Sequence, residues 1–251
     1  MSDWNGKIST SATKEAMARD ACEHAIKKLS DALDRKRQVR LLAATGASQL
    51  DFLGLVTASR QIDWPRVELF HLDEYIGISE THPASFARYI RERIVEKTGI
   101  VKFHLLDGSG KPDEVIARMN SMIAAAPIDV AFAGIGENAH LAFNDPPADF
   151  ETEVPYLRVR LDEACRRQQL GEGWFASFDD VPKEAISMSV RQILKSESIL
   201  CIVPDTRKAA AVKAAVEGPI TPHVPASILR THPDVRLFLD RNSAGLLTAE
   251  M

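Results

Sequence analysis

Short apolar runs that alternate with amphipathic segments constrain the fold of this 251-residue chain more than any other feature of its sequence. Runs of about six residues are too short for buried helices but suit strands covered on both faces of a parallel sheet. The alternation predicts an α/β fold with a mostly parallel, doubly wound sheet and helices on both faces. The runs expected to form strands are Val39–Ala44, Val67–Leu72, Ile128–Ala133, Ala185–Val190, Ser198–Val203 and Val235–Asp240.

The segments between these runs carry the helical pattern. Within 11–36, apolar residues such as Cys22, Ala25 and Leu29 recur at helical spacing with charged residues between them. We expect further helices over 49–60, 84–98, 112–125 and 208–216, and a loop over 103–111. No linker divides the chain, which predicts a single α/β domain over residues 1–251. Residues 147–180 lack periodicity and are interpreted as a lid over a pocket, with a passive excursion as the alternative.

Composition excludes several classes of protein. The formal net charge of −4 leaves no basic footprint for nucleic acid. No stretch approaches the length of about 18 apolar residues that a membrane span needs, and residues 1–7 contain no apolar signal region. The three cysteines form no CxxC pair, which suits the reducing cytoplasm. No set of His, Cys and carboxylate residues has the spacing of metal ligands, so no metal or cofactor is expected.

A cluster of ionisable and polar residues lies shortly after the apolar run Ile128–Ala133. Gly134 and Gly136 end the run, and they are followed by Glu137, Asn138, His140, Asn144 and Asp145. The carboxyl ends of parallel strands are where open α/β sheets bind their ligands. Imidazole titrates near neutral pH and a neighbouring carboxylate can orient it, so His140 and Asp145 form a candidate acid–base pair. The alternative is a polar loop whose Asx side chains only stabilise turns.

Three other positions are candidates for the same edge of the sheet. Asp73 follows the run Val67–Leu72 and is either catalytic or a helix cap. Thr45, Gly46, Ala47 and Ser48 join a strand to a helix, where free backbone N–H groups can bind an anion, although an ordinary tight turn fits equally well. This loop does not match the P-loop pattern, so a nucleotide is not implied. Lys208 stands at a helix start, which the helix dipole disfavours for a cation; it either serves a ligand anion or is a solvated surface lysine.

Taken together, these motifs resemble the glucosamine-6-phosphate deaminase family, which includes galactosamine-6-phosphate deaminases and is related to the 6-phosphogluconolactonases. The similarity extends from about Ala43 to Asp240, nearly the whole chain. Several motifs in the right order carry it rather than any one alone. They are Ala44-Thr45-Gly46-Ala47-Ser48, Leu72-Asp73-Glu74-Tyr75-Ile76-Gly77, the stretch from Gly134 to Pro146, and Val216-Glu217-Gly218-Pro219.

The resemblance implies a modified Rossmann-like fold and a deaminating aldose–ketose isomerase. Its substrate would be a small phosphorylated amino sugar, glucosamine 6-phosphate, converted to fructose 6-phosphate and ammonia; a homo-oligomer is left open. By position, Asp73 would be the base that moves the proton between carbons, and His140 would open the sugar ring with Asp145 holding the imidazole. The residues expected at the phosphate are Thr45, Gly46, Ala47, Ser48, Lys208 and, in the lid segment, Arg166.

Two departures from the family pattern bear on the substrate. Asn138 stands where the family commonly has an acid two residues before the histidine, and Asp145 replaces a longer Glu. Asparagine still forms hydrogen bonds and is kept as a member of the catalytic set, but it cannot take up negative charge. It also resembles the galactosamine-6-phosphate branch, so a galactosamine-6-phosphate deaminase is one rival function.

Two rival functions lie outside amino-sugar deamination. The first is a 6-phosphogluconolactonase-like hydrolase. Tyr75 argues against it, because lactonases tend to have arginine at this position. The second is a non-catalytic sugar-phosphate sensor, because a fold that binds a sugar phosphate need not turn it over.

Overall fold

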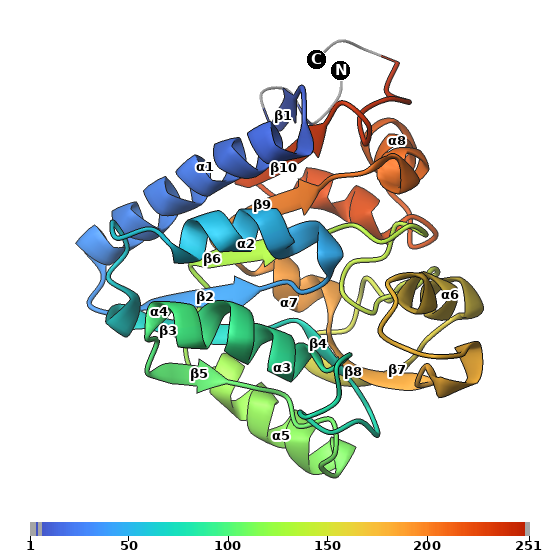
Figure 1. The fold of residues 1–251 in the computed structure, drawn as a ribbon, viewed down its shortest axis with the longest axis horizontal. Coiled ribbons are helices and arrows are strands. Elements are labelled where there is room, and N and C mark those ends of the chain that lie inside the picture. Colours follow the sequence, from blue (N-terminus) through green and yellow to red (C-terminus); the bar gives the residue numbers. More distant parts are fainter. Residues whose placement is uncertain (1–3, 5–6, 249–251) are drawn as a thin grey trace.

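The computed structural model describes Trp4 and residues 7–248 of the chain. The N-terminal segment in which we expect no signal region therefore lies almost wholly outside the described residues. In the described part, seven strands form one parallel sheet in the order β1-β10-β9-β6-β2-β3-β5 (Figure 1). The strands are β1 (Ile8–Ser11), β2 (Val39–Ala43), β3 (Val67–His71), β5 (Lys102–His104), β6 (Val130–Ala133), β9 (Ser198–Val203) and β10 (Val235–Asp240).

Helices cover both faces of this sheet. Alternate residues of a strand point to opposite faces, so Leu41 belongs to one apolar cluster and Leu42 to the other. The Leu41 cluster is covered by α1 (Lys14–Arg35), α2 (Leu50–Thr57) and the continuous helix formed by α3 (Phe86–Ile90), the π-helix η3 (Arg91–Val95) and α4 (Glu96–Thr98). The Leu42 cluster is covered by α5 (Pro112–Ile123), α7 (Val190–Leu194) and α8 (Ala209–Glu217). The predicted doubly wound α/β fold is confirmed.

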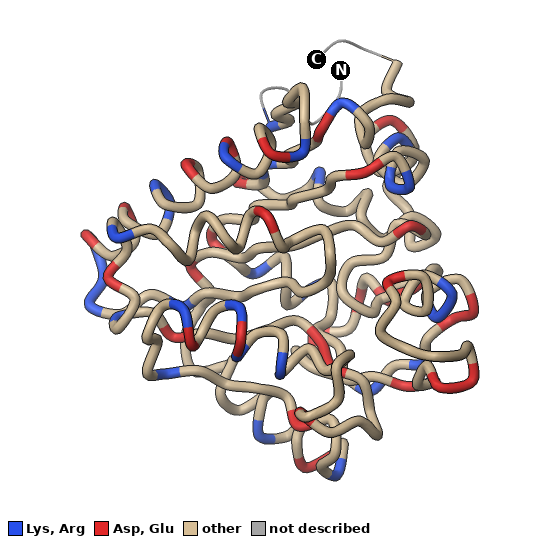
Figure 2. Tube along the Cα trace, in the orientation of Figure 1, with Lys and Arg blue, Asp and Glu red and all other residues tan. Residues whose placement is uncertain are grey.

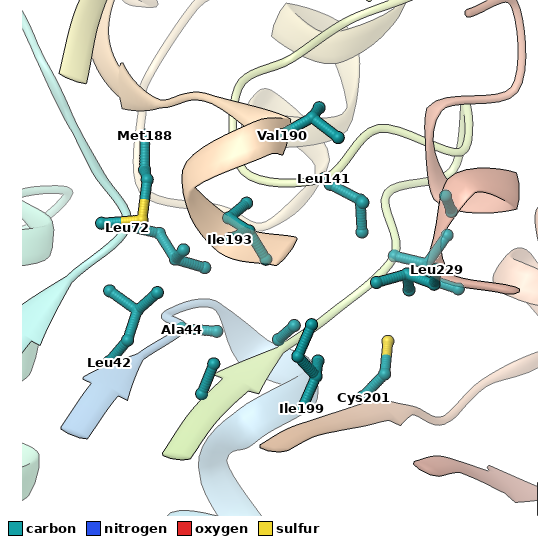
Figure 3. Packing of buried hydrophobic residues seen from close by; sticks show 14 of the residues in the cluster. Leu42, Ala44, Leu72, Leu141, Met188, Val190, Ile193, Ile199, Cys201 and Leu229 are labelled. Carbon is teal, nitrogen blue, oxygen red and sulfur yellow. The ribbon is translucent and has the colours of Figure 1, made fainter. Parts of the chain in front are cut away.

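The Leu42 cluster takes its apolar side chains from several elements. Figure 3 shows Leu42 and Ala44 from β2 and its end, Ile199 and Cys201 from β9, and Val190 and Ile193 from α7 gathered in one apolar layer. Cys201 is fully buried there, which agrees with its place in an apolar run. Short 3-10 helices complete the connections: η1 (Ala47–Gln49), η2 (Trp64–Arg66), η4 (Phe178–Asp180), η5 (Thr206–Lys208) and η6 (Pro225–Thr231).

A second, antiparallel sheet departs from the prediction. It contains β4 (Asp73–Tyr75), β8 (Glu184–Met188) and β7 (Tyr156–Arg160), in the order β4-β8-β7. The run Ala185–Val190 was expected in the main sheet, but its strand lies here instead. β8 is the middle strand of three and is almost wholly buried, so its apolar run looks like that of a central parallel strand. Burial on both faces does not reveal which sheet a strand joins.

One expectation about an irregular segment is wrong, because the expected loop 103–111 overlaps the edge strand β5. Residues 147–180 contain β7 and the helix α6 (Glu163–Gly171) despite their lack of periodicity. Their interpretation as a lid stays a prediction. β5 is short and only partly buried, so it lacks the apolar run that marks an inner strand. Helix α6 is mostly polar because it lies at the surface of the molecule beside the carboxyl ends of the strands (Figure 1).

The strand order creates a crevice near the middle of the sheet. After β2 the chain adds β3 and β5 on one side, and β6 then returns to the other side of β2. The loops that follow β2 and β6 therefore leave in opposite directions, and ligands of open α/β sheets bind at such a switch point. Basic and acidic residues are interspersed along the whole trace (Figure 2). None of the helices in the described residues is long and apolar enough to cross a membrane.

Candidate active site

A cavity lies at the switch point, bounded by the carboxyl ends of four strands of the main sheet. Loops after β2, β3, β6 and β9 supply its wall, and helix α6 closes it from the side of residues 147–180. Among the predicted site residues, those that line the cavity are Thr45, Gly46, Ala47, Ser48, Asp73, His140 and Lys208. The chain thus brings together residues that are more than 150 positions apart in its sequence, since Thr45 and Lys208 line one cavity.

The loop after β2 has the geometry of an anion-binding turn. Gly46 has a φ of 96°, which few residues with a side chain adopt, and η1 begins immediately after it. The Gly46 carbonyl accepts hydrogen bonds from the Gln49 N–H at 3.1 Å and the Tyr89 hydroxyl at 3.0 Å. Gln49 is fully buried and donates through Nε2 to the Ile202 carbonyl, which ties the loop to β9. The loop is therefore held rigid with its N-terminal helix end toward the cavity.

Lys208 is a buried cation that faces the same cavity. Its side chain is only 7% exposed, and no acceptor in the described chain forms a hydrogen bond or ion pair with its ammonium. Burial lowers the pKa of Lys208, while the nearby carboxylates of Glu137 and Glu172 oppose that shift. A buried charge without a partner is costly unless a ligand supplies the counter-charge. The solvated-surface interpretation of Lys208 is therefore wrong, and the cavity is suited to an anion.

Asp73 and Glu74 point in different directions because they are consecutive residues of β4. Glu74 accepts hydrogen bonds from the Phe86 and Ala87 N–H groups and the Ser85 hydroxyl, so it caps α3. The Asp73 side chain lines the cavity, is 6% exposed, and its carboxylate accepts no hydrogen bond from the described residues. The capping role therefore belongs to Glu74 rather than Asp73.

The carboxyl of Asp73 has a perturbed pKa. Burial, together with the charge of Glu74, raises the pKa of this group well above its usual 3.8. Such a shift suits a proton acceptor that works closer to neutral pH.

His140, Asn138 and Asp145 form one network behind the cavity wall. The His140 Nδ1 lies 3.2 Å from Asp145 Oδ1, within ion-pair range but without the alignment of a hydrogen bond. Asn138 donates through Nδ2 to Asp145 Oδ1 at 3.1 Å and accepts the His140 backbone N–H at 3.1 Å. Of the three, only His140 lines the cavity. Burial acts to raise the pKa of Asp145, but its contacts with His140 and its other donors outweigh burial and lower it overall.

Gly136 makes room for the His140 ring. A Cβ atom on Gly136 would stand 2.3 Å from His140 Nε2, far inside van der Waals contact. Since packing forbids that approach, Gly136→Ala is expected to push the imidazole out of place and lower kcat by about tenfold or more. Gly54→Ala is a matched control, because a Cβ there meets nothing within 4 Å. Steady-state kinetics of both variants check the expectation, and unchanged turnover of Gly136→Ala would show that the ring position does not matter.

Arg166 is not part of this cavity. Its guanidinium donates to the Phe178 carbonyl at 2.7 Å and the Val181 carbonyl at 2.8 Å, and lies 4.1 Å above the Phe178 ring. These contacts fasten α6 to the turn that follows it. The position of Arg166 therefore does not support the expectation that it reaches the phosphate. The sequence could not have shown this, because it does not indicate which way a side chain of α6 points.

Several cavity residues were not found from the sequence. They are Lys14, Gln168, Gln169, Glu172 and Arg207. Arg207 could have been suggested by its position beside Lys208; it lies 3.4 Å from Glu137 and 3.2 Å from Asp205 at the cavity rim. The others come from α1 and from α6 and the residue after it, whose placement over the strand ends is a tertiary feature without a local signal.

One group of possible metal ligands occurs in the described chain. Ligand atoms of His140, Asp145 and Cys165 lie within 4.8 Å of one another. Burial, followed by the charges of Asp145 and Asp162, raises the pKa of the Cys165 thiol, so it stays protonated. A metal needs the thiolate. Asp145 also accepts hydrogen bonds from Asn138 and from the Asp162 backbone N–H. The group therefore fits a hydrogen-bonded network better than a metal site.

Comparison with known proteins gives one consistent family. The model of "Glucosamine-6-phosphate isomerases/6-phosphogluconolactonase" matches residues 12–237. A glucosamine-6-phosphate deaminase of Lacticaseibacillus paracasei is 34% identical over 233 residues, covering 91% of this chain and 95% of its own. A solved structure described as a monomeric glucosamine-6-phosphate deaminase has a TM-score of 0.87 at 27% identity and covers 96% of this chain and 99% of that one. The fold is also shared with 6-phosphogluconolactonase from Thermotoga maritima, with a TM-score of 0.78 at 16% identity and coverage of 93% of this chain and 98% of that one.

Proposed function

This chain belongs to the family of glucosamine-6-phosphate isomerases and 6-phosphogluconolactonases, and within that family we propose that it converts glucosamine 6-phosphate to fructose 6-phosphate and ammonia. The resemblance inferred from its motifs is thereby confirmed at the level of the family. The observation that carries the proposal is that Asp73 and His140 line the same cavity as Lys208 and the Thr45–Ser48 loop. A proton acceptor, an imidazole and an anion site thus face one small molecule.

Binding begins at the phosphate. The buried ammonium of Lys208 supplies the counter-charge, and the backbone N–H groups of the Thr45–Ser48 loop supply donors at a helix start. Binding energy from this end, which does not react, orients the sugar ring toward Asp73 and His140. We leave Arg166 out of the phosphate site because its guanidinium is already bound to carbonyl groups of residues 178 and 181.

The reaction then needs proton transfers at the ring oxygen, at C2 and at C1. His140 protonates the ring oxygen while the C1 hydroxyl gives up its proton to solvent, so the C1–O bond of the ring breaks and the open-chain aldehyde forms. Asp73 removes the proton from C2, which bears the amine, and the aldehyde oxygen takes up a proton from solvent, which gives an enol amine. Asp73 then returns a proton to C1. The product is a 2-imino sugar, which water hydrolyses to the ketone with release of ammonia. Asp145 and Asn138 hold the imidazole of His140 through their contacts with its ring and its backbone N–H.

Assays with three substrates test the proposal. Ammonia should be released from glucosamine 6-phosphate, measured by coupling to glutamate dehydrogenase. A 6-phosphogluconolactonase would instead acidify a solution of its lactone, and a non-catalytic sensor would bind glucosamine 6-phosphate without turnover. Parallel assays with galactosamine 6-phosphate decide the epimer, for which Asn138 is the relevant departure from the family pattern. Absence of ammonia from glucosamine 6-phosphate would overturn the proposal, and release from galactosamine 6-phosphate alone would favour the rival deaminase.

We further propose a cytoplasmic location and a phosphorylated amino sugar as the small-molecule partner, with no nucleic acid or membrane partner and with a homo-oligomer left open. Cys22, Cys165 and Cys201 are all free and buried, which suits a reducing compartment. The proposed mechanism uses only side chains and water, so it calls for no metal or cofactor.

Lys208→Met should act mainly on binding. Loss of one charge-assisted hydrogen bond to phosphate corresponds to a rise in KM of about tenfold, with a much smaller change in kcat. Lys213→Met is the matched control, since Lys213 lies within α8, the helix that Lys208 precedes, but pairs with Glu217. Steady-state kinetics and calorimetric titration with the sugar phosphate check the result. An unchanged affinity would remove Lys208 from the phosphate site.

A further inference from the structure

Asp162 joins the start of α6 to the network around His140. Its Oδ1 accepts the Cys165 backbone N–H at 2.6 Å, so it is the N-cap of the helix. Its own backbone N–H donates to Asp145 Oδ2 at 2.9 Å. Its second carboxylate oxygen, Oδ2, accepts from Asn138 Nδ2 at 3.4 Å. Asp162 therefore reaches Asp145 by two routes, one direct and one through Asn138.

Asn138 lies between two carboxylates, and its orientation follows from its partners. Its Oδ1 accepts the His140 N–H, so its amide nitrogen must face the acids. That nitrogen is 3.1 Å from Asp145 Oδ1 and 3.4 Å from Asp162 Oδ2. A neutral amide thus bridges two negative groups that would otherwise repel each other.

Among residues 7–248, few charged or titratable groups contact this bridge. On the loop after β6 they are His140 and Asp145, and on α6 and its cap they are Cys165 and Asp162. The Cys165 thiol is held neutral by burial and by the two acids. The charge of Asp73 also raises the pKa of the Cys165 thiol, and its effect is smaller than those of Asp145 and Asp162. Asp145 and Asp162 are therefore the two acids that can balance a protonated imidazole at His140.

We propose that Asp162 is a positioning residue for the His140–Asp145 pair: it aligns Asp145 and supplies the second negative charge of the cluster. The inference rests on the proposed function, because it assigns Asp162 to the step in which His140 acts as an acid. Asp162 does not line the cavity, so it acts through Asn138 and Asp145 rather than on the sugar.

The first test is D162N. Asparagine is as good an N-cap as aspartate and keeps the backbone N–H bond to Asp145, but it removes the charge and sets one amide against another. We expect kcat to fall about tenfold with KM unchanged, as for loss of a hydrogen bond to a charged group. The descending limb of the kcat–pH profile should move to lower pH, because a cluster with one carboxylate fewer holds a proton less firmly. D162S, which also caps a helix, should behave in the same way.

The second test exchanges the two ends of one hydrogen bond. N138D alone places three carboxylates together and should lower both Tm and kcat. N138D/D162N keeps the net charge of the cluster and restores a donor–acceptor pair between positions 138 and 162, although position 138 no longer donates to Asp145. Tm and kcat should therefore recover relative to N138D. If Asp162 only capped α6, D162N would not relieve the defect of N138D.

The outcomes separate this inference from the proposed function. A wild-type protein that releases no ammonia would overturn the function itself. An active wild type with an equally active D162N, or a double variant no better than N138D in Tm and kcat, would overturn the role of Asp162 alone. A D162N defect with an unmoved pH profile would also count against it, because a purely structural change leaves that limb in place.

Discussion

Replacing Asp73 with asparagine is expected to lower kcat by about 10³-fold, the range of a lost general base, while the sugar phosphate still binds. The substitution keeps the size of the side chain at a buried position, 6% exposed, and removes its ability to accept a proton. The Asp73 carboxylate forms no hydrogen bond within the described part of the chain, so the fold should not depend on its charge. Calorimetric titration of the inactive variant with glucosamine 6-phosphate measures the binding that should remain.

The pH profile gives the same prediction a second readout. A base acts when it is ionised, so kcat/KM rises with pH through the pKa of Asp73. Burial raises that pKa well above 3.8, so the rise should lie at higher pH than for a free aspartate. Asp34→Asn, at an exposed position of α1, is the matched control. Near-normal turnover of Asp73→Asn would exclude Asp73 as the base.

His140→Gln has the second-largest expected effect, a fall in kcat of about 10²-fold. Glutamine can form hydrogen bonds from the same site but cannot donate a proton to the ring oxygen. The open-chain form of the sugar arises slowly without catalysis, so some activity should persist. Assays that follow ring opening separately from ammonia release would place the defect at the first step.

A histidine elsewhere provides the control for this variant. His223 is exposed and does not line the cavity, so His223→Gln should have normal kinetics. If His140→Gln retained full turnover, ring opening would need no acid from the protein, and the contact with Asp145 would be structural only. Thermal denaturation of His140→Gln distinguishes a local loss of acid catalysis from partial unfolding.

The two assigned roles are also what separates the amino-sugar reaction from lactone hydrolysis on the same fold. Hydrolysis of a ring ester needs activated water but no proton transfer between neighbouring carbons. A buried aspartate with a raised pKa just past the end of β3 is therefore most useful to an isomerising enzyme. Loss of ammonia release in Asp73→Asn, with binding kept, would tie the isomerisation to this residue.

Sequence periodicity was enough to predict most strands of the main sheet. It also predicted the edge of the sheet at which the polar residues gather. Parallel strands all end at one edge, so residues that follow different apolar runs had to meet there. Asp73, His140 and Lys208 each follow such a run, and the cavity contains all three. Periodicity could not separate Asp73 from Glu74 as the helix cap, because only the pleat of β4 decides which acid faces α3.

Local pattern determined the α/β class, the positions of the inner strands along the chain and the edge of the sheet at which the site residues lie. Strands buried on both faces require apolar runs, and helices require apolar residues at helical spacing, so both can be recognised in the sequence. Tertiary structure alone decided that β8 joins an antiparallel sheet, that Arg166 turns away from the cavity, and that Asp162 meets Asn138 and Asp145. Those outcomes depend on which partner each backbone or side chain finds across long sequence separations. A pattern confined to neighbouring residues carries no information about such a partner.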